Sequence, residues 1–257
     1  MFKRVTGSTL TALASLFLVT PAFAFDHAHS QLDKVLRAHV KQGQVNYGDL
    51  ARHRAELDGY VAGLAAVSLE QERSFSPRQA KAFWINAYNA LTLKLILDEK
   101  PRTSIRDIDQ AWDRPRFEVA GREVSLNDIE HKILRPRFKD PRLHAVLVCA
   151  ARSCPILEAK VFRAKGLERR LEAANRRFAR DKSRNRFDQE AKVIYASRIF
   201  EWYGDDYIAR YAKTGGGEDK LAAVRGFFIE EVGAPAAAAG GAELRYLDYD
   251  WSLNGNW

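Results

Sequence analysis

The sequence predicts an α+β fold, a helix-rich single domain with a central apolar helix and a small, mostly antiparallel sheet. Three observations lead to this prediction. Apolar residues recur at helical spacing in several segments, the stretch between Ser76 and Pro101 is apolar on nearly every side, and only short stretches have the pattern of strands. The 257 residues, of which 46% are hydrophobic, are enough to bury one core, so we expect residues 25–257 to form one domain.

The first elements are helices. Residues 31–41 and 52–65 carry apolar side chains at helical spacing. Ser76 is a good N-cap and Pro77 suits the first helical turn, so we expect a helix from there to just before Pro101. Because this helix is apolar on nearly every side, it should lie at the centre of the fold.

Short strands and helices follow. Residues 116–124 predict a hairpin with its turn at Ala120 and Gly121, and residues 125–134 predict a helix that Pro136 should end. The almost wholly apolar run from Leu143 to Cys149 predicts a buried strand. The rest of the chain predicts a basic helix within 163–186, a strand at 192–196, helices near 197–212 and 219–232, a flexible linker at 233–241 and a last strand at 243–249.

Residues 1–24 have the features of a secretory signal peptide. Lys3 and Arg4 precede an apolar stretch over 10–19, and a small-x-small cleavage pattern ends at Ala24. The apolar stretch is shorter than the roughly 20 residues that span a bilayer, and no later segment supplies such a run. We therefore expect a periplasmic or secreted mature chain without a transmembrane segment.

The remaining chain is mildly basic. Loss of residues 1–24 removes two basic residues and no acidic one, which lowers the formal net charge from +8 to +6. Much of the excess lies within 163–186, where arginines surround an apolar stripe, a pattern typical of a solvated helix face packed on a core. Binding to an acidic cell-envelope surface stays open. The sequence has no recognisable nucleic-acid-binding motif, which argues against a nucleic-acid partner.

His131, Cys149 and Cys154 fall within 24 residues, and the two cysteines are the only ones in the chain. Cys154 precedes Pro155, and a turn into a new helical segment would put its thiol beside unpaired backbone N–H groups. These groups and the neighbouring Arg152 favour the thiolate, which is the reactive form of cysteine.

These residues predict a thiol hydrolase or acyltransferase that acts on an amide or a thioester. Cys154 would be the nucleophile and His131 its base. Asn86 or Glu130 would orient the base, and Asn86 could also donate a hydrogen bond to an oxyanion. No cofactor is needed for this chemistry.

Other polar and aromatic residues are candidates for contacts with a small-molecule or peptide substrate. Carboxylates and aromatic rings occur together at 201–203 and 248–251, a combination that lines carbohydrate or peptide grooves but also fills cores. Two asparagines lie three residues apart in the apolar helix, where each either holds a loop or contacts a ligand. We predict substrate contacts for Asn89, His144, Arg152, Trp202 and Asp250.

Two other interpretations of the cysteines stay open. In an exported chain, Cys149 and Cys154 are close enough in sequence to form a disulfide, and the protein would then be a non-catalytic cell-envelope binding module. His131, His144 and the two cysteines have the atom types of a zinc site, but their spacing matches no familiar zinc motif. We therefore predict no metal.

The chain also resembles a known family. Six phrases are similar to the motifs of the domain-of-unknown-function 547 family, namely residues 82–91, 125–134, 140–149, 153–155, 197–203 and 246–254. The chain is identified as an exported bacterial member of this family, which has no established activity. Its fold is similar to the papain and transglutaminase type of thiol enzyme. Those enzymes carry their cysteine at the start of the central helix, whereas this helix offers only Asn86 and Asn89.

Overall fold

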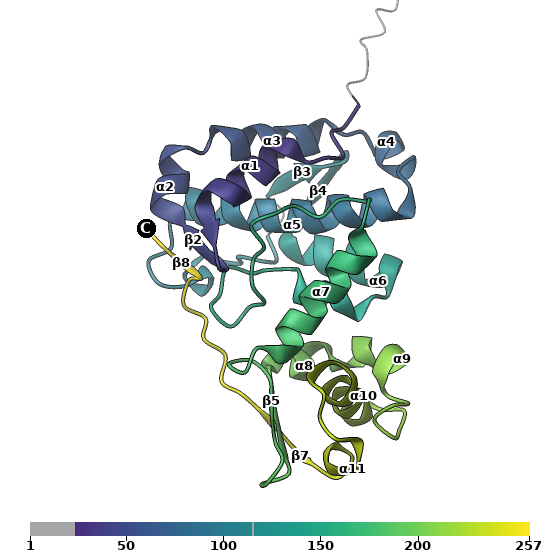
Figure 1. Ribbon diagram of the computed structural model, residues 1–257. Helices are drawn as coiled ribbons and strands as arrows, with labels where there is room; N and C mark the ends of the chain where they lie inside the picture. Colours follow the sequence, from purple (N-terminus) through teal and green to yellow (C-terminus); the bar gives the residue numbers. More distant parts are fainter. Residues whose placement is uncertain (1–23, 115) are drawn as a thin grey trace, which may run out of the picture.

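The computed structural model describes residues 24–114 and 116–257 (Figure 1). The predicted signal peptide therefore lies, apart from Ala24, outside the described residues. Helices dominate the fold and the strands form three small sheets, which confirms the predicted α+β class. Three of the five strand pairings among these residues are antiparallel and two are parallel.

The N-terminal part is a layer of helices over the central helix α5 (Figure 1). Its elements are α1 (Ser30–His39), β1 (Val40–Lys41), β2 (Gln44–Asn46), α2 (Tyr47–Arg52), α3 (Ala55–Ala66) and α4 (Leu69–Arg73). The two predicted helices correspond to α1 and α3. Strands β1 and β2 were not predicted, because strands of two or three residues are too short to show a period.

Helix α5 (Pro77–Glu99) confirms the central-helix prediction. Ser76 caps it with a complete capping box, in which the Gln79 side chain accepts a hydrogen bond from the Ser76 N–H. The helix ends at Lys100, whose φ of 48° is left-handed. Most of its residues between Ala80 and Leu97 are buried, so α5 supplies a fixed frame for the segments that pack on it.

The predicted hairpin at 116–124 is present as β3 (Phe117–Val119) and β4 (Arg122–Val124), after the short helix η1 (Ile105–Asp107). The next helix is η2 (Asp128–Leu134), which continues into α6 (Arg135–Phe138). Pro136 therefore does not end the helix as predicted. It lies in the first turn of α6, at the point where the helix changes from η2 to α6.

The predicted strand from Leu143 to Cys149 is wrong. The structure has a short helix, η3 (Pro141–Ala145), and residues 146–149 after it belong to no strand. The side chain of Asn89 on α5 takes the place of that strand. Its Nδ2 donates to the Val146 carbonyl over 2.9 Å, and the Val148 N–H donates to its Oδ1 over 3.0 Å.

The remaining helices gather in a second layer, joined to the first by α7 (Leu167–Arg180) (Figure 1). They are α8 (Arg198–Tyr203), η4 (Gly204–Tyr207), α9 (Ile208–Tyr211), α10 (Lys220–Phe227), η5 (Phe228–Val232) and α11 (Ala236–Ala239). The last of these replaces part of the predicted linker. Beside them β6 (Val193–Ala196) pairs with β5 (Arg186–Asp188) and β7 (Glu243–Tyr246).

Buried apolar residues form two clusters, one around α5 and one among α8 to α10. The C-terminal segment after β7 runs from the second cluster back to the first, where β8 (Gly255–Asn256) pairs with β2. Tyr249 in this segment packs against both clusters. Within residues 24–114 and 116–257, no helix has the length and apolar character needed to cross a membrane.

Candidate active site

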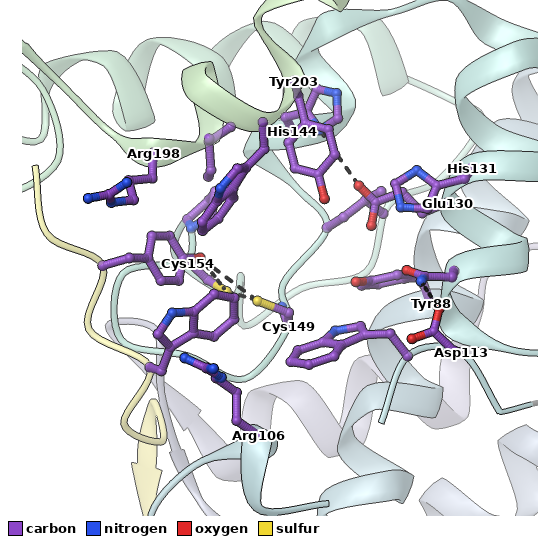
Figure 2. Close-up of a pocket in the computed structure, with 18 of the residues that line it drawn as sticks. Tyr88, Arg106, Asp113, Glu130, His131, His144, Cys149, Cys154, Arg198 and Tyr203 are labelled. Carbon is purple, nitrogen blue, oxygen red and sulfur yellow. Dashed lines mark hydrogen bonds and ion pairs between the residues drawn. The ribbon is translucent and has the colours of Figure 1, made fainter. Parts of the chain in front are cut away.

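A cleft of about 980 Å³ lies where the two apolar clusters meet. Residues of α5, η2, α8, the segment after η3 and the C-terminal segment line it. The lining includes both cysteines, two histidines, carboxylates, arginines and a set of aromatic rings (Figure 2). A concave site with apolar walls and a few convergent polar groups is the usual form of a ligand site.

The two thiols lie side by side on one wall of this cleft (Figure 2). The Cys149 N–H donates to the Cys154 sulfur over 3.2 Å, and the Tyr249 hydroxyl donates to the same sulfur over 3.3 Å. Both cysteines are free, so the structure does not contain the Cys149–Cys154 disulfide that the sequence left open. Cys154 is buried and Cys149 is half-buried.

The two thiols differ in acidity. Burial opposes ionisation of Cys154, but hydrogen bonds from Cys149, Tyr249 and the Ala151 backbone outweigh it and lower the pKa of Cys154. The hydrogen bond to Cys154 and burial raise the pKa of Cys149. Cys154 is therefore the group that ionises first, with Cys149 as a donor to it.

Neither asparagine of α5 contacts the cleft, which corrects the roles predicted for both. Asn86 is buried, and its amide pairs with the backbone of Phe162, donating over 2.7 Å and accepting over 2.9 Å. Asn89 is occupied in the same way by the segment 146–148. Both are structural amides, and Asn89 holds the chain immediately before Cys149.

The histidines lie on another wall, away from the thiols (Figure 2). Arg135 donates to His131 Nδ1 over 2.8 Å, and because arginine only donates, this nitrogen is an acceptor that is already in use. Among the described residues, no hydrogen bond joins either thiol to an imidazole. The prediction that His131 is the base for Cys154 is therefore corrected.

His144 is held by carboxylates. Its Nε2 donates to Asp206 over 2.7 Å, and its Nδ1 lies 3.8 Å from Glu130. Arg135 binds the same Asp206 through two nitrogens, and these hydrogen bonds lower the pKa of Asp206 although burial opposes the shift. Glu130 therefore faces His144 instead of orienting His131 as predicted.

Aromatic rings form the mouth of the cleft near the thiols. The ring of Trp202 lies 4.9 Å from Tyr249 and 5.6 Å from Trp251, and Trp112 lies 5.8 Å from Trp251. Trp202 is 40% exposed, as expected of a residue that is free to contact a ligand. Arg106 stacks on Trp251 with its guanidinium 5.4 Å from the ring.

Arg152 and Asp250 lie outside this cleft, which corrects their predicted substrate contacts. Both line a separate pocket of about 490 Å³. Asp250 accepts hydrogen bonds from the Ser252 N–H and hydroxyl, which lower its pKa. The Arg152 N–H pairs with the Ser252 carbonyl. Both residues thus fix the C-terminal segment against the turn that carries Cys154.

Several site residues were not predicted. Tyr249 lies in the phrase 248–251, whose aromatic rings we noted as part of a groove or a core. Its effect on the pKa of Cys154 was not predicted. Tyr203 lies in the phrase 201–203, whose rings we noted only as part of a groove or a core. Tyr88 and Asp206 gave no signal, because a single tyrosine or aspartate in a helix is most often a packing or surface residue. Within the described ranges, no three His, Cys, Asp or Glu side chains are grouped as metal ligands would be.

Comparison with known proteins gives a family match for part of the chain. No curated protein and no solved structure matches the chain. The similarity to the papain and transglutaminase fold therefore stays a prediction. Residues 73–179 match the model of the family described as "Protein of unknown function, DUF547". This range includes α5, η2 and both cysteines, and over it the chain matches the DUF547 family that its motifs predicted.

Proposed function

We propose that the cleft is the active site of a thiol-dependent acyltransferase or hydrolase, with Cys154 as the nucleophile and a thioester as the preferred substrate. The observation that carries this proposal is the hydrogen bonding of the Cys154 sulfur. Donation from the Cys149 N–H and the Tyr249 hydroxyl lowers the pKa of Cys154 at the wall of a cleft large enough for a substrate.

The reaction begins with attack of the Cys154 thiolate on the acyl carbon. A new bond forms between sulfur and carbon, the bond to the leaving group breaks, and the leaving group takes the electron pair of that bond. The acyl group, now a thioester of Cys154, passes to water in a hydrolase or to another nucleophile in a transferase, which regenerates the thiolate.

The surroundings of Cys154 favour a thioester over an amide. A thiolate leaves without first taking a proton, whereas an amine leaving group needs a general acid. Cys154 has no imidazole to serve as that acid among the described residues. Cys149 and Tyr249 are its only side-chain donors there, and both have a raised pKa. The hydrogen bond to Cys154 and burial raise the pKa of Cys149, and chiefly burial raises the pKa of Tyr249.

Trapping of the acyl-enzyme tests this proposal. Incubation with a short series of acyl thioesters of N-acetylcysteamine should add one acyl group to Cys154, as located by peptide mass spectrometry. Cys154→Ala should abolish the adduct, whereas the matched Cys149→Ala variant should keep it at a lower rate because one donor is lost. Labelling of Cys149 alone, or of neither thiol in the folded protein, would contradict the proposal.

The proposed setting of this activity is the periplasm or the extracellular space. The features of residues 1–24 support it, with a basic start, a short apolar stretch and a cleavage pattern. The partner is a small-molecule or peptide substrate, or a component of the cell envelope. Fractionation of cells that express the full chain, with N-terminal sequencing of the product, tests both the localisation and the cleavage after Ala24.

The aromatic mouth of the cleft favours a second candidate, a non-catalytic module that binds a cell-envelope component. Rings such as those of Trp202 and Trp251 stack on sugar or peptide groups without any need for a thiolate. The two candidates separate on Cys154→Ala. A binding module keeps its ligand affinity and its cellular role in that variant, whereas a thiol enzyme loses its role.

A further inference from the structure

Glu130 lies across the cleft from the thiols, near Tyr88 and Tyr203 (Figure 2). Both tyrosines line the cavity, and the negative charge of Glu130 adds to burial in raising the pKa of each hydroxyl. The acyl-transfer chemistry of Cys154 does not use this group of three residues.

The Glu130 carboxylate has a long ion pair with His144 but accepts no hydrogen bond among the described residues. The residue is 6% exposed, and no side chain or backbone N–H in the described parts of the chain donates a hydrogen bond to its carboxylate. The nearest histidine nitrogen, Nδ1 of His144, is 3.8 Å away, and His144 already donates to Asp206. Arg135 is bound by Asp206 and His131. Glu130 is therefore a buried charge that faces a cavity.

Positive and negative side chains lie on opposite sides of the cleft. Arg106 and Arg198 lie on the side of the thiols, whereas Asp113 and Glu130 lie on the other side (Figure 2). Arg198 is paired with Glu201 over 2.6 Å, and Arg106 stacks on an aromatic ring. A ligand that spans the cleft meets carboxylates at the end opposite Cys154.

We propose that Glu130, with the hydroxyls of Tyr88 and Tyr203, binds a primary ammonium group on the acyl part of the substrate. A buried carboxylate is costly unless a donor with positive charge meets it, and a primary ammonium brings three N–H donors to three acceptors. Tyrosine rings also favour a cation. This inference rests on the proposed role of Cys154, because it places the acyl carbon at one end and the amine at the other.

Binding of simple probes tests the ammonium site without any chemistry at Cys154. Butyl-, hexyl- and octylammonium are compared with the matching primary alcohols by calorimetry on the mature chain with Cys154→Ala. At least one ammonium should bind about tenfold more tightly than its alcohol, as expected for one charged hydrogen-bonded pair. Equal binding of ammonium and alcohol at every chain length overturns the inference.

Variants locate the site. Glu130→Gln should remove the preference for ammonium, whereas Glu123→Gln should keep it, because Glu123 is an exposed residue of β4 that does not line the cleft. A preference that survives in folded Glu130→Gln overturns the inference. Should Glu130→Gln not fold, Tyr203→Phe replaces it, with a preference about threefold smaller expected and an unchanged preference as the contrary result. Failure of the acyl-enzyme experiment leaves these binding results unaffected, so the two proposals fail separately.

Discussion

At the scale of single residues, the site is a set of hydrogen bonds to one sulfur. Cys154 is buried, and burial alone would raise the pKa of its thiol. The donors around it reverse that effect, and the Tyr249 hydroxyl is the one that a substitution can remove with little change of shape. The reactive form of Cys154 therefore depends on a residue 95 positions away in the sequence.

Tyr249→Phe should raise the pKa of Cys154, because the variant loses one hydrogen bond to the sulfur that favours the thiolate. Because only the thiolate reacts, alkylation by iodoacetamide increases as pH rises through the pKa of Cys154. The midpoint of its rate against pH should move upward in the variant. Tyr246→Phe, in β7 of the same C-terminal segment, is the control and should leave the midpoint in place. An unchanged midpoint in Tyr249→Phe would remove this tyrosine from the site.

At the scale of elements, α5 acts as a clamp for two segments that have no strand to pair with. Asn86 and Asn89 each bind a backbone N–H and a backbone carbonyl, one pair in the segment at Phe162 and the other just before the thiols. Burying these backbone groups without partners would be unfavourable. The helix thus fixes the thiol wall through Asn89, while Tyr88 of the same helix lines the cleft.

Removal of either clamp should destabilise the fold, but only one should affect the thiols. Asn89→Ala leaves a buried carbonyl and a buried N–H unpaired, and we expect a loss of about 2–4 kcal/mol in the free energy of unfolding, measured with urea. The Asn86→Ala control should lose a similar amount. Alkylation of Cys149 should become faster in Asn89→Ala alone, and equal rates in the two variants would show that the clamp does not control the thiol wall.

At the scale of the whole molecule, the cleft exists because two apolar clusters meet and one C-terminal segment crosses between them. Half-buried ion pairs stabilise the start of η3, the helix that carries His144 of the cleft. Asp140 accepts hydrogen bonds from Lys81 over 2.9 Å and from the Arg142 guanidinium over 2.8 Å. Its side chain also caps η3, by accepting from the Arg142 N–H. Burial opposes ionisation, but these contacts lower the pKa of Asp140 to about 2.

Acid should therefore weaken the fold in a defined range. The folded pKa of Asp140 lies below its ordinary value of 3.8, so its contribution is present above that value and is lost as pH falls toward about 2. Asp140→Asn should reduce the difference in unfolding free energy between pH 6 and pH 2.5 by about 2 kcal/mol. Asp109→Asn, at an exposed position, is the control. An equal difference in wild type and Asp140→Asn would contradict the assignment.

Local patterns were enough to predict much of the fold. The capping box at Ser76 and an apolar period on every side determined α5, and the turn at Ala120 and Gly121 determined the hairpin, because these signals act between neighbours in sequence. The clustering of cysteines and the family motifs likewise indicated the thiol wall. The single-domain prediction and the signal peptide stay predictions.

Tertiary structure alone decided which groups meet. An apolar run before Cys149 reads as a strand, but a side-chain amide from a distant helix satisfies its backbone, so no strand forms. The sequence suggested an imidazole for Cys154, whereas the folded chain brings Tyr249 to the sulfur and directs His144 to Asp206. Long-range pairing of this kind has no local signal, because hydrogen bonds between distant residues depend on how the elements pack rather than on the spacing of residues along the chain.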